Sequence, residues 1–135
     1  MKQNVLLVIT SLLSILFQTF HLTSDFVYEK GGMSRSAFLI VVLFLVVWLY
    51  GTLVLAERRS GYIIILVGSL LGLSVPVVHM SGAGISDEIV KSSGAFFFVW
   101  TLIALGVTSL FSIILSVRGL WSLQRQARDR FVKQT

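Results

Sequence analysis

The sequence contains no cysteine and only one proline. The missing thiols exclude disulfide frameworks, thiolate metal sites and cysteine nucleophiles. Charged residues make up only 13% of the 135 residues, against about 25% in an average soluble protein. Hydrophobic residues make up 56%, and the mean hydropathy is +0.91. This balance excludes a disordered chain and indicates an integral membrane protein rather than a soluble domain.

Charge is scarce enough to leave four apolar stretches, at residues 4–22, 37–56, 62–80 and 95–117. A membrane-spanning helix needs about 20 apolar residues to cross about 30 Å of hydrocarbon. The stretches are too long for barrel strands and do not alternate polar with apolar residues, so we expect helices. The short segment 57–61 makes the second and third helices antiparallel neighbours. The sequence therefore predicts one all-α integral membrane domain, residues 1–135, in which four transmembrane helices form an up-down-up-down bundle.

Lys and Arg are distributed unequally between the two predicted sides of the membrane. With both termini in the cytoplasm, only three of the 11 cations fall outside, namely Lys30, Arg35 and Lys91. Short cytoplasmic segments of membrane proteins carry the excess of Lys and Arg. We therefore predict that both termini are cytoplasmic, and we expect the protein in a bacterial cytoplasmic membrane.

The sequence pI of about 10.1 arises largely from residues 118–135. At 100° per residue, Leu120, Leu123, Ala127 and Phe131 share one face of a helix in this segment. The cations that we assign to the membrane surface are Arg118, Arg125, Arg128, Arg130 and Lys133. Such a segment favours a short amphipathic helix that rests on anionic lipid headgroups rather than a nucleic-acid-binding surface. The alternative is a frayed tail whose charges only set the orientation.

A polar stripe follows one side of the first span. Its members fall within an arc of about 100° on a helix; they are Asn4, Ser11, Ser14, Gln18, His21 and Asp25. Because exposure of polar groups to hydrocarbon is costly, we expect this side to face other helices or a cavity. For the serines, simple hydrogen bonds to backbone or to neighbouring helices are the plainer interpretation.

Small residues form ridges on the third and fourth spans. Gly68 and Gly72 make a GxxxG pair, which allows a neighbouring backbone to approach closely. The ridge on the fourth span consists of Ala104, Thr108, Ser112 and Ser116. These ridges serve either the internal fold or self-association. The second span lacks such a face beyond Gly51 and Thr52, so we assign it to the lipid side, with Trp48 near the inner boundary.

Two histidines are predicted at matched depth near the outer surface. His21 and His79 each follow the start of their span by 17 residues, in a faint internal repeat. The nearby acidic candidates are Asp25, Asp87 and Glu88. Two imidazoles could hold a b-type haem, and imidazoles with carboxylates could bind a divalent metal. Proton transfer or contact with a quinone is a further option, and an interfacial role without a ligand is the plain one.

No catalytic motif accompanies these residues, so whether the protein is an enzyme stays open. The leading hypothesis is a small membrane subunit or accessory protein that packs into a homo- or hetero-oligomeric assembly and presents an outward-facing polar site. The runner-up is a redox or cation-handling protein with a bis-histidine site. A proton- or quinone-linked membrane enzyme or transporter component is the third hypothesis.

Overall fold

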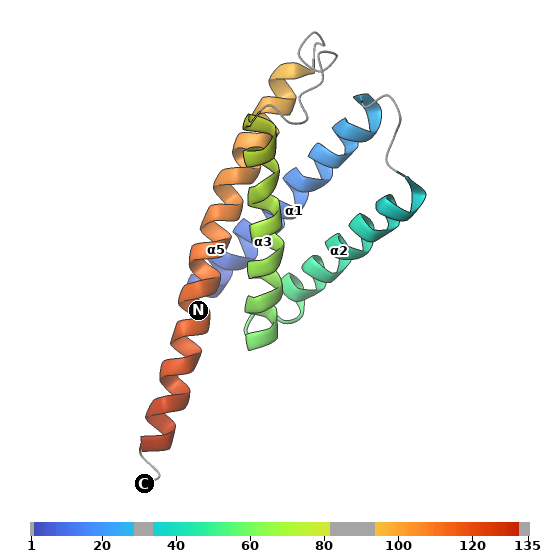
Figure 1. Cartoon of the computed structure of the whole chain (residues 1–135). Helices are drawn as coiled ribbons and strands as arrows, with labels where there is room; N and C mark the ends of the chain where they lie inside the picture. The colour runs from blue at the N-terminus through green and yellow to red at the C-terminus, as the bar shows by residue number, and fades with distance from the viewer. Residues whose placement is uncertain (1, 29–33, 82–93, 133–135) are drawn as a thin grey trace.

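The computed structural model describes residues 2–28, 34–81 and 94–132, without the side chains of residues 2, 3, 25–28 and 131. These residues form four helices: α1 (Lys2–Tyr28), α2 (Arg35–Leu53), α3 (Arg59–Met80) and α5 (Ala95–Val132) (Figure 1). Each helix is long and apolar enough to cross a membrane. The predicted all-helical class and the four spans are therefore confirmed.

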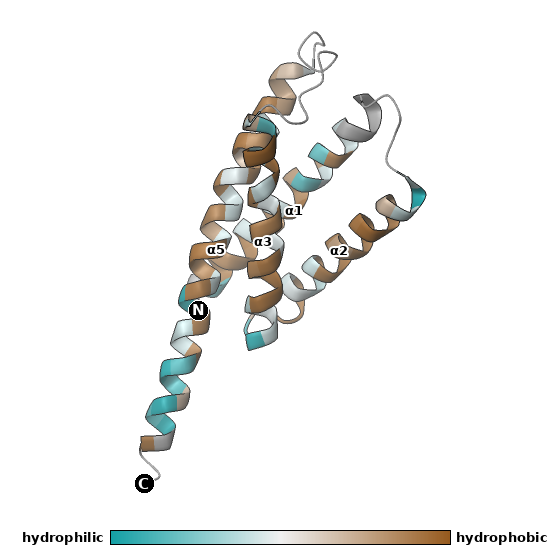
Figure 2. Ribbon diagram, in the orientation of Figure 1, coloured by the Kyte–Doolittle hydropathy of each residue, from teal (hydrophilic) through white to brown (hydrophobic). Residues whose placement is uncertain are grey.

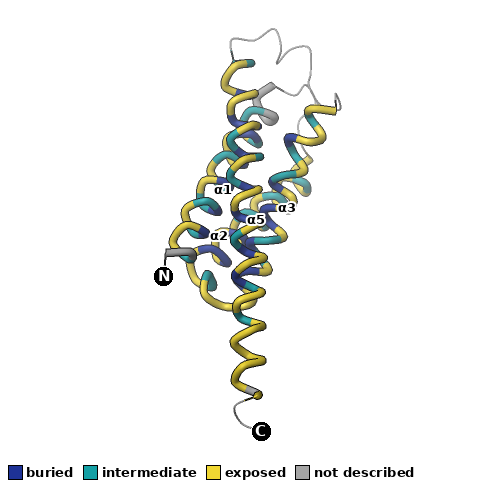
Figure 3. Tube along the Cα trace, turned by 90° about the vertical axis from the view of Figure 1, so that its left-hand side faces the viewer, coloured by how far each residue is buried: buried dark blue, intermediate teal, exposed yellow. Residues whose placement is uncertain are grey.

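The distribution of polar residues is the reverse of that in a soluble protein. Among the described side chains, ten polar ones are buried, against seven large hydrophobic ones. Exposed Leu, Ile, Val and Phe side chains cover the outside of all four helices (Figures 2 and 3). A lipid environment makes this arrangement favourable, because apolar side chains can face the acyl chains while hydroxyl groups find partners between helices.

Contacts at the two ends of the helices define their relative directions. At one end, Tyr62 of α3 donates a 2.8 Å hydrogen bond to Asn4 Oδ1 of α1 and lies against Gly119 of α5. At the other end, His21 of α1 and His79 of α3 meet Phe98 of α5. We call these the tyrosine end and the histidine end. Helices α1 and α3 therefore run in one direction and α5 in the other.

The connection between α2 and α3 differs slightly from the prediction. Helix α2 ends at Leu53 and α3 begins at Arg59, so the turn precedes the expected segment 57–61. Arg58 N donates to Leu55 O at 2.8 Å within this turn. The same carbonyl lies where a Cβ on Gly61 would be, so the backbones can approach this closely only at a glycine.

Helix α2 packs against the others only near the tyrosine end. Its buried residues are Trp48, Gly51 and Thr52, and its other end extends away from α3 and α5 (Figure 1). The sequence led us to expect Trp48 at the lipid boundary, but its side chain is only 1% exposed and lies inside the helix assembly. The assignment of the whole second span to the lipid side is therefore wrong at this end, because Gly68 and Gly72 of α3 provide space for the indole.

Helix α5 continues without interruption from Ala95 to Val132. The predicted break after residue 117, followed by a separate interfacial helix, is absent from this described stretch. Leu120 and Leu123 pack beside the buried core at the tyrosine end. The helix then extends past the other three as an exposed basic arm (Figure 2), in which Arg125 lies 4.6 Å from the Trp121 ring centre. We call residues 124–132 the α5 arm.

Candidate functional site

The polar stripe of α1 faces the interior of the helix assembly. Ser11 and Ser14 are fully buried, Gln18 is 8% exposed and His21 is 2% exposed. Ser14 Oγ donates to Thr10 O within α1 at 2.9 Å, whereas Ser11 Oγ lies 2.7 Å from Thr52 Oγ1 of α2. The stripe thus combines bonds within α1 and bonds between helices. It ends in His21, and the side chain of Asp25, one turn further, lies outside the described residues.

The small residues of α3 and α5 are used for packing within the chain. A Cβ on Gly68 would collide with the Trp48 ring, and one on Gly72 would lie 2.8 Å from Ser109 Oγ. Ser112 and Ser116 are fully buried. Ala104 and Thr108, by contrast, are only half-buried, because a strict four-residue spacing drifts by about 40° per step around a helix of 3.6 residues per turn.

Sequence reasoning missed three buried hydroxyl residues: Ser69, Thr101 and Ser109. Each step of four residues carries a ridge about 40° further around its helix, toward the side on which the next residue in sequence lies. Ser69, which follows Gly68, and Ser109, which follows Thr108, lie on that side. Ser69 Oγ and Ser109 Oγ are buried without a hydrogen-bond partner among the described residues. Following the true period of 3.6 residues instead of fixed steps of four would have identified them.

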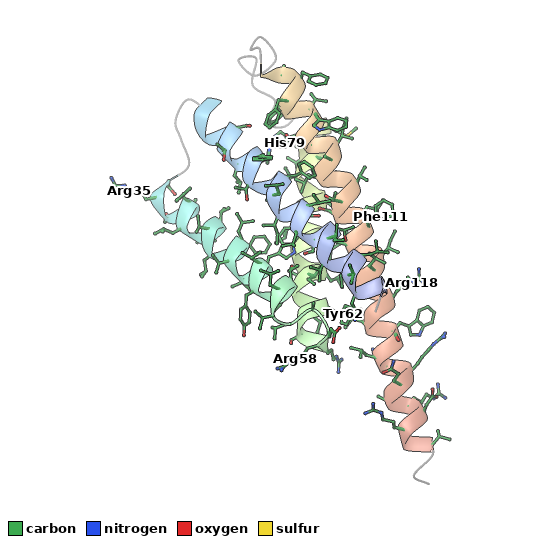
Figure 4. All side chains as sticks on the ribbon, turned by 180° about the vertical axis from the view of Figure 1, so that it is seen from behind. Arg35, Arg58, Tyr62, His79, Phe111 and Arg118 are labelled. Atoms are coloured by element: carbon green, nitrogen blue, oxygen red, sulfur yellow. The ribbon has the colours of Figure 1, made fainter. Side chains whose placement is uncertain are left out.

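The structure brings the two histidines into direct contact. The ring centres of His21 and His79 are 4.8 Å apart and the ring planes are nearly perpendicular, at 87°. Phe98 of α5 touches both rings, with each centre-to-centre distance 5.5 Å. Figure 4 shows His79 near the end of α3 that is remote from Tyr62. The pair therefore occupies the three-helix interface of α1, α3 and α5 at the histidine end.

A backbone hydrogen bond fixes the orientation of His79. Its Nδ1 lies 2.9 Å from Val75 O, one turn earlier in α3. A carbonyl oxygen can only accept, so Nδ1 carries the proton and Nε2 of the neutral ring is left with its lone pair. Such a second contact holds a metal-binding imidazole in one tautomer and one orientation.

The distance between the rings distinguishes between the possible ligands. An imidazole nitrogen binds a metal such as zinc at about 2.0–2.1 Å, so two imidazoles on a tetrahedral ion have ring centres about 5 Å apart. The observed 4.8 Å matches this spacing. Two axial imidazoles of a haem lie more than about 6 Å apart, with the porphyrin between them. The observed ring-centre distance is compatible with one tetrahedral ion and equally with two imidazoles in plain edge-to-face contact, and it is shorter than the spacing of two axial haem ligands.

The described part of the chain does not provide a complete set of ligands for such an ion. No group of three or more His, Asp or Glu side chains that could hold a metal occurs there. Asp87 and Glu88, as well as the side chain of Asp25, lie outside the described residues. Gln18, three residues before His21, has a buried Oε1 with no hydrogen-bond partner among the described residues. An amide oxygen so placed can accept from a water or bind a cation.

A groove lies between α1 and α2 near the histidine end. Its volume is about 660 Å³. The side chains that line it are Thr19, Leu22, Thr23, Arg35, Phe38, Leu39, Val41, Val42 and Leu45. The groove forms because α2 contacts the other helices mainly around Trp48, beyond the groove.

The predicted membrane-surface cations have different positions. Arg118, Arg125, Arg128 and Arg130 are exposed on α5, whereas Lys133 lies outside the described residues.

Comparison of the chain with protein-family models, with curated proteins and with solved structures finds no match.

Proposed function

We propose that the chain is a small integral membrane accessory subunit whose functional element is a bis-histidine site for a transition-metal ion. The observation that carries this proposal is the 4.8 Å contact between His21 and His79. The two residues belong to different helices, and their rings meet inside a membrane-spanning domain. Ionisable residues in this position are costly and mark functional sites more often than packing positions.

The chemistry of imidazole indicates the class of ligand. Neutral imidazole binds zinc, copper, nickel and iron ions, whereas magnesium and calcium prefer oxygen. The bond from His79 Nδ1 to Val75 O leaves Nε2 as the ligand atom of this residue. Gln18, one turn before His21, would offer a buried amide oxygen, and water or a residue outside the described ranges would complete the coordination.

Metal titration of the purified full-length protein tests the site. We expect about one equivalent of Zn²⁺ or Cu⁺ to bind, and we expect His21→Ala and His79→Ala each to weaken binding at least about tenfold, since even loss of an outer-shell contact has this effect. Asn4→Ala is the matched control, because it removes a polar side chain of the same stripe at the tyrosine end. Unchanged affinity in both histidine variants, with helicity retained, would refute the metal site.

The accessory role has a separate test. The GxxxG pair of α3 is already filled by Trp48 and Ser109, and Ser112 and Ser116 of the α5 ridge are buried within the chain. A partner would therefore contact the lipid-facing sides rather than these ridges. Gentle solubilisation of native membranes should yield the chain in a complex larger than itself. A chain that migrates alone at natural abundance would refute this half of the proposal.

The orientation in the membrane also belongs to the proposal. We infer that both termini are cytoplasmic and that the membrane is the bacterial cytoplasmic membrane. The support is the position of Arg58, Arg59 and Arg118 close to the tyrosine end, where Figure 4 shows Arg58 and Arg118 near Tyr62. Segments rich in Lys and Arg remain on the cytoplasmic side during insertion.

A further inference from the structure

The groove between α1 and α2 is about as long, measured along α2, as one membrane leaflet is thick. Its α2 wall runs from Arg35 to Leu45, a distance of about 15 Å at 1.5 Å per residue. The hydrocarbon core of a bilayer is about 30 Å thick, so each leaflet contributes about 15 Å. The groove closes just beyond Leu45, where Trp48 joins α2 to α1 through a 3.0 Å hydrogen bond to Ser11 Oγ.

The walls of this groove are apolar in their chemistry. Among the described residues that line it, the polar ones besides Arg35 are Thr19 and Thr23. Their hydroxyl groups donate to Ile15 O and to Thr19 O, each at 2.8 Å, within α1 itself. The remaining lining is aliphatic or aromatic, so an occupant of the groove must be hydrocarbon over most of its length.

A cation stands at the mouth of the groove. Arg35 is the first residue of α2 and lies at the tip of this helix (Figure 4). Its guanidinium can donate two parallel hydrogen bonds to a phosphate. The start of α2, which is capped by Ser34 Oγ through Ala37 N at 3.2 Å, adds the positive end of the helix dipole. Among the described residues, the mouth therefore presents one cation beside a hydrocarbon-lined channel.

We propose that this groove binds one glycerophospholipid with an anionic headgroup, its phosphate at Arg35 and an acyl chain extending toward Leu45. The lining favours a lipid over a partner helix, because one molecule with an anionic headgroup and an acyl chain matches both the cation at the mouth and the hydrocarbon walls. The lipid would fill the space that α2 leaves between itself and α1. This proposal is independent of the histidine site.

The test uses full-length protein in vesicles of equal parts phosphatidylglycerol and phosphatidylcholine, followed by native mass spectrometry. We expect the wild-type protein to retain one phosphatidylglycerol molecule. In Arg35→Gln, the preference of the protein for phosphatidylglycerol over phosphatidylcholine should fall about fivefold, which corresponds to the attraction of about 1 kcal/mol per cation at an anionic surface. Arg59→Gln is the matched control, because Arg59 is also the first residue of its helix but lies at the tyrosine end.

A second pair of variants tests the groove itself. Val42→Trp fills the groove and should abolish retention of the lipid, whereas Leu43→Trp, on another face of α2, should not. A lipid with a photoreactive acyl chain should cross-link to residues 38–45 in the wild type. The proposal fails if Arg35→Gln leaves the preference unchanged, if the two tryptophan variants behave alike, or if a protein rather than a lipid cross-links at Val42.

Discussion

The indole of Trp48 occupies the space that any side chain at Gly68 would need. This pairing joins α2 to α3, and it places the largest buried side chain of the described core against a glycine. A residue in the second span thus explains why a small residue is required in the third. The GxxxG pair therefore makes room for an aromatic ring of the same chain.

Replacement of Gly68 by alanine should therefore destabilise the fold. The new Cβ would overlap the Trp48 ring, and overpacking of this kind costs about 1–3 kcal/mol. Gly106→Ala is the control, since its Cβ would lie at an ordinary 3.4 Å from Pro76 Cγ. The free energy of unfolding of both variants is measured in mixed micelles, with tryptophan fluorescence as the signal. Equal stability of the two variants would contradict the packing described.

Ser11 links two helices through a closed set of hydrogen bonds. Trp48 Nε1 donates to Ser11 Oγ at 3.0 Å, Ser11 pairs with Thr52 Oγ1 at 2.7 Å, and Thr52 Oγ1 donates to Trp48 O at 2.9 Å. Ser11→Ala leaves the indole N–H unpaired. We expect the free energy of unfolding to fall by about 1–2 kcal/mol. This figure lies between the cost of a buried unpaired donor and the hydrogen-bond energies measured between membrane helices.

The exposed Ser74 provides the control for this substitution, because its hydroxyl donates only to Leu71 O of its own helix. Ser74→Ala should leave the free energy of unfolding within about 0.5 kcal/mol of the wild type. The same unfolding assay compares the two variants. A loss in Ser74→Ala as large as that in Ser11→Ala would show that the closed network adds no specific stability.

Single-cysteine labelling can determine the orientation, because the natural chain has no cysteine that would react. Ser60 and Ser81 are both exposed and lie at opposite ends of α3. With cytoplasmic termini, Ser81→Cys should react with a membrane-impermeant maleimide in intact cells, and Ser60→Cys only after permeabilisation. The reverse pattern would invert the proposed orientation.

Proline substitutions can test whether the arm of α5 is structurally separate from the packed part. Gln124→Pro lies in the α5 arm and should lower helicity without loss of thermal stability, because residues 124–130 are exposed. Leu110→Pro lies where α5 packs against α1 and α3, and should cost about 3 kcal/mol or more. Circular dichroism with thermal melting distinguishes the two. A stability loss in Gln124→Pro would mean that the arm contributes to the core.

The inward side of α1 could be predicted because lipid imposes a simple constraint. Ser11, Ser14, Gln18 and His21 repeat with the helical period, and polar groups avoid hydrocarbon. The four spans follow from length and hydropathy in the same way. The matched depth of His21 and His79 was also predictable, but their contact was not, since it depends on the rotation and separation of two helices.

Other features depend on tertiary packing that the sequence pattern does not encode. A tryptophan near the end of an apolar span usually marks the lipid interface, so the burial of Trp48 became evident only from its position over Gly68. The continuity of α5 was missed because Arg118 and Gly119 interrupt the apolar run, although neither breaks a helix here. Gly119 is needed instead to make room for the Tyr62 ring.

The length of α5 has a mechanical consequence. Its 38 residues measure about 57 Å at 1.5 Å per residue, nearly twice the thickness of a hydrocarbon core. One continuous rod therefore connects the basic arm to Phe98, the side chain that contacts both imidazoles. The exposed arm and the aromatic contact of the two histidines therefore belong to the same uninterrupted helix, toward its opposite ends.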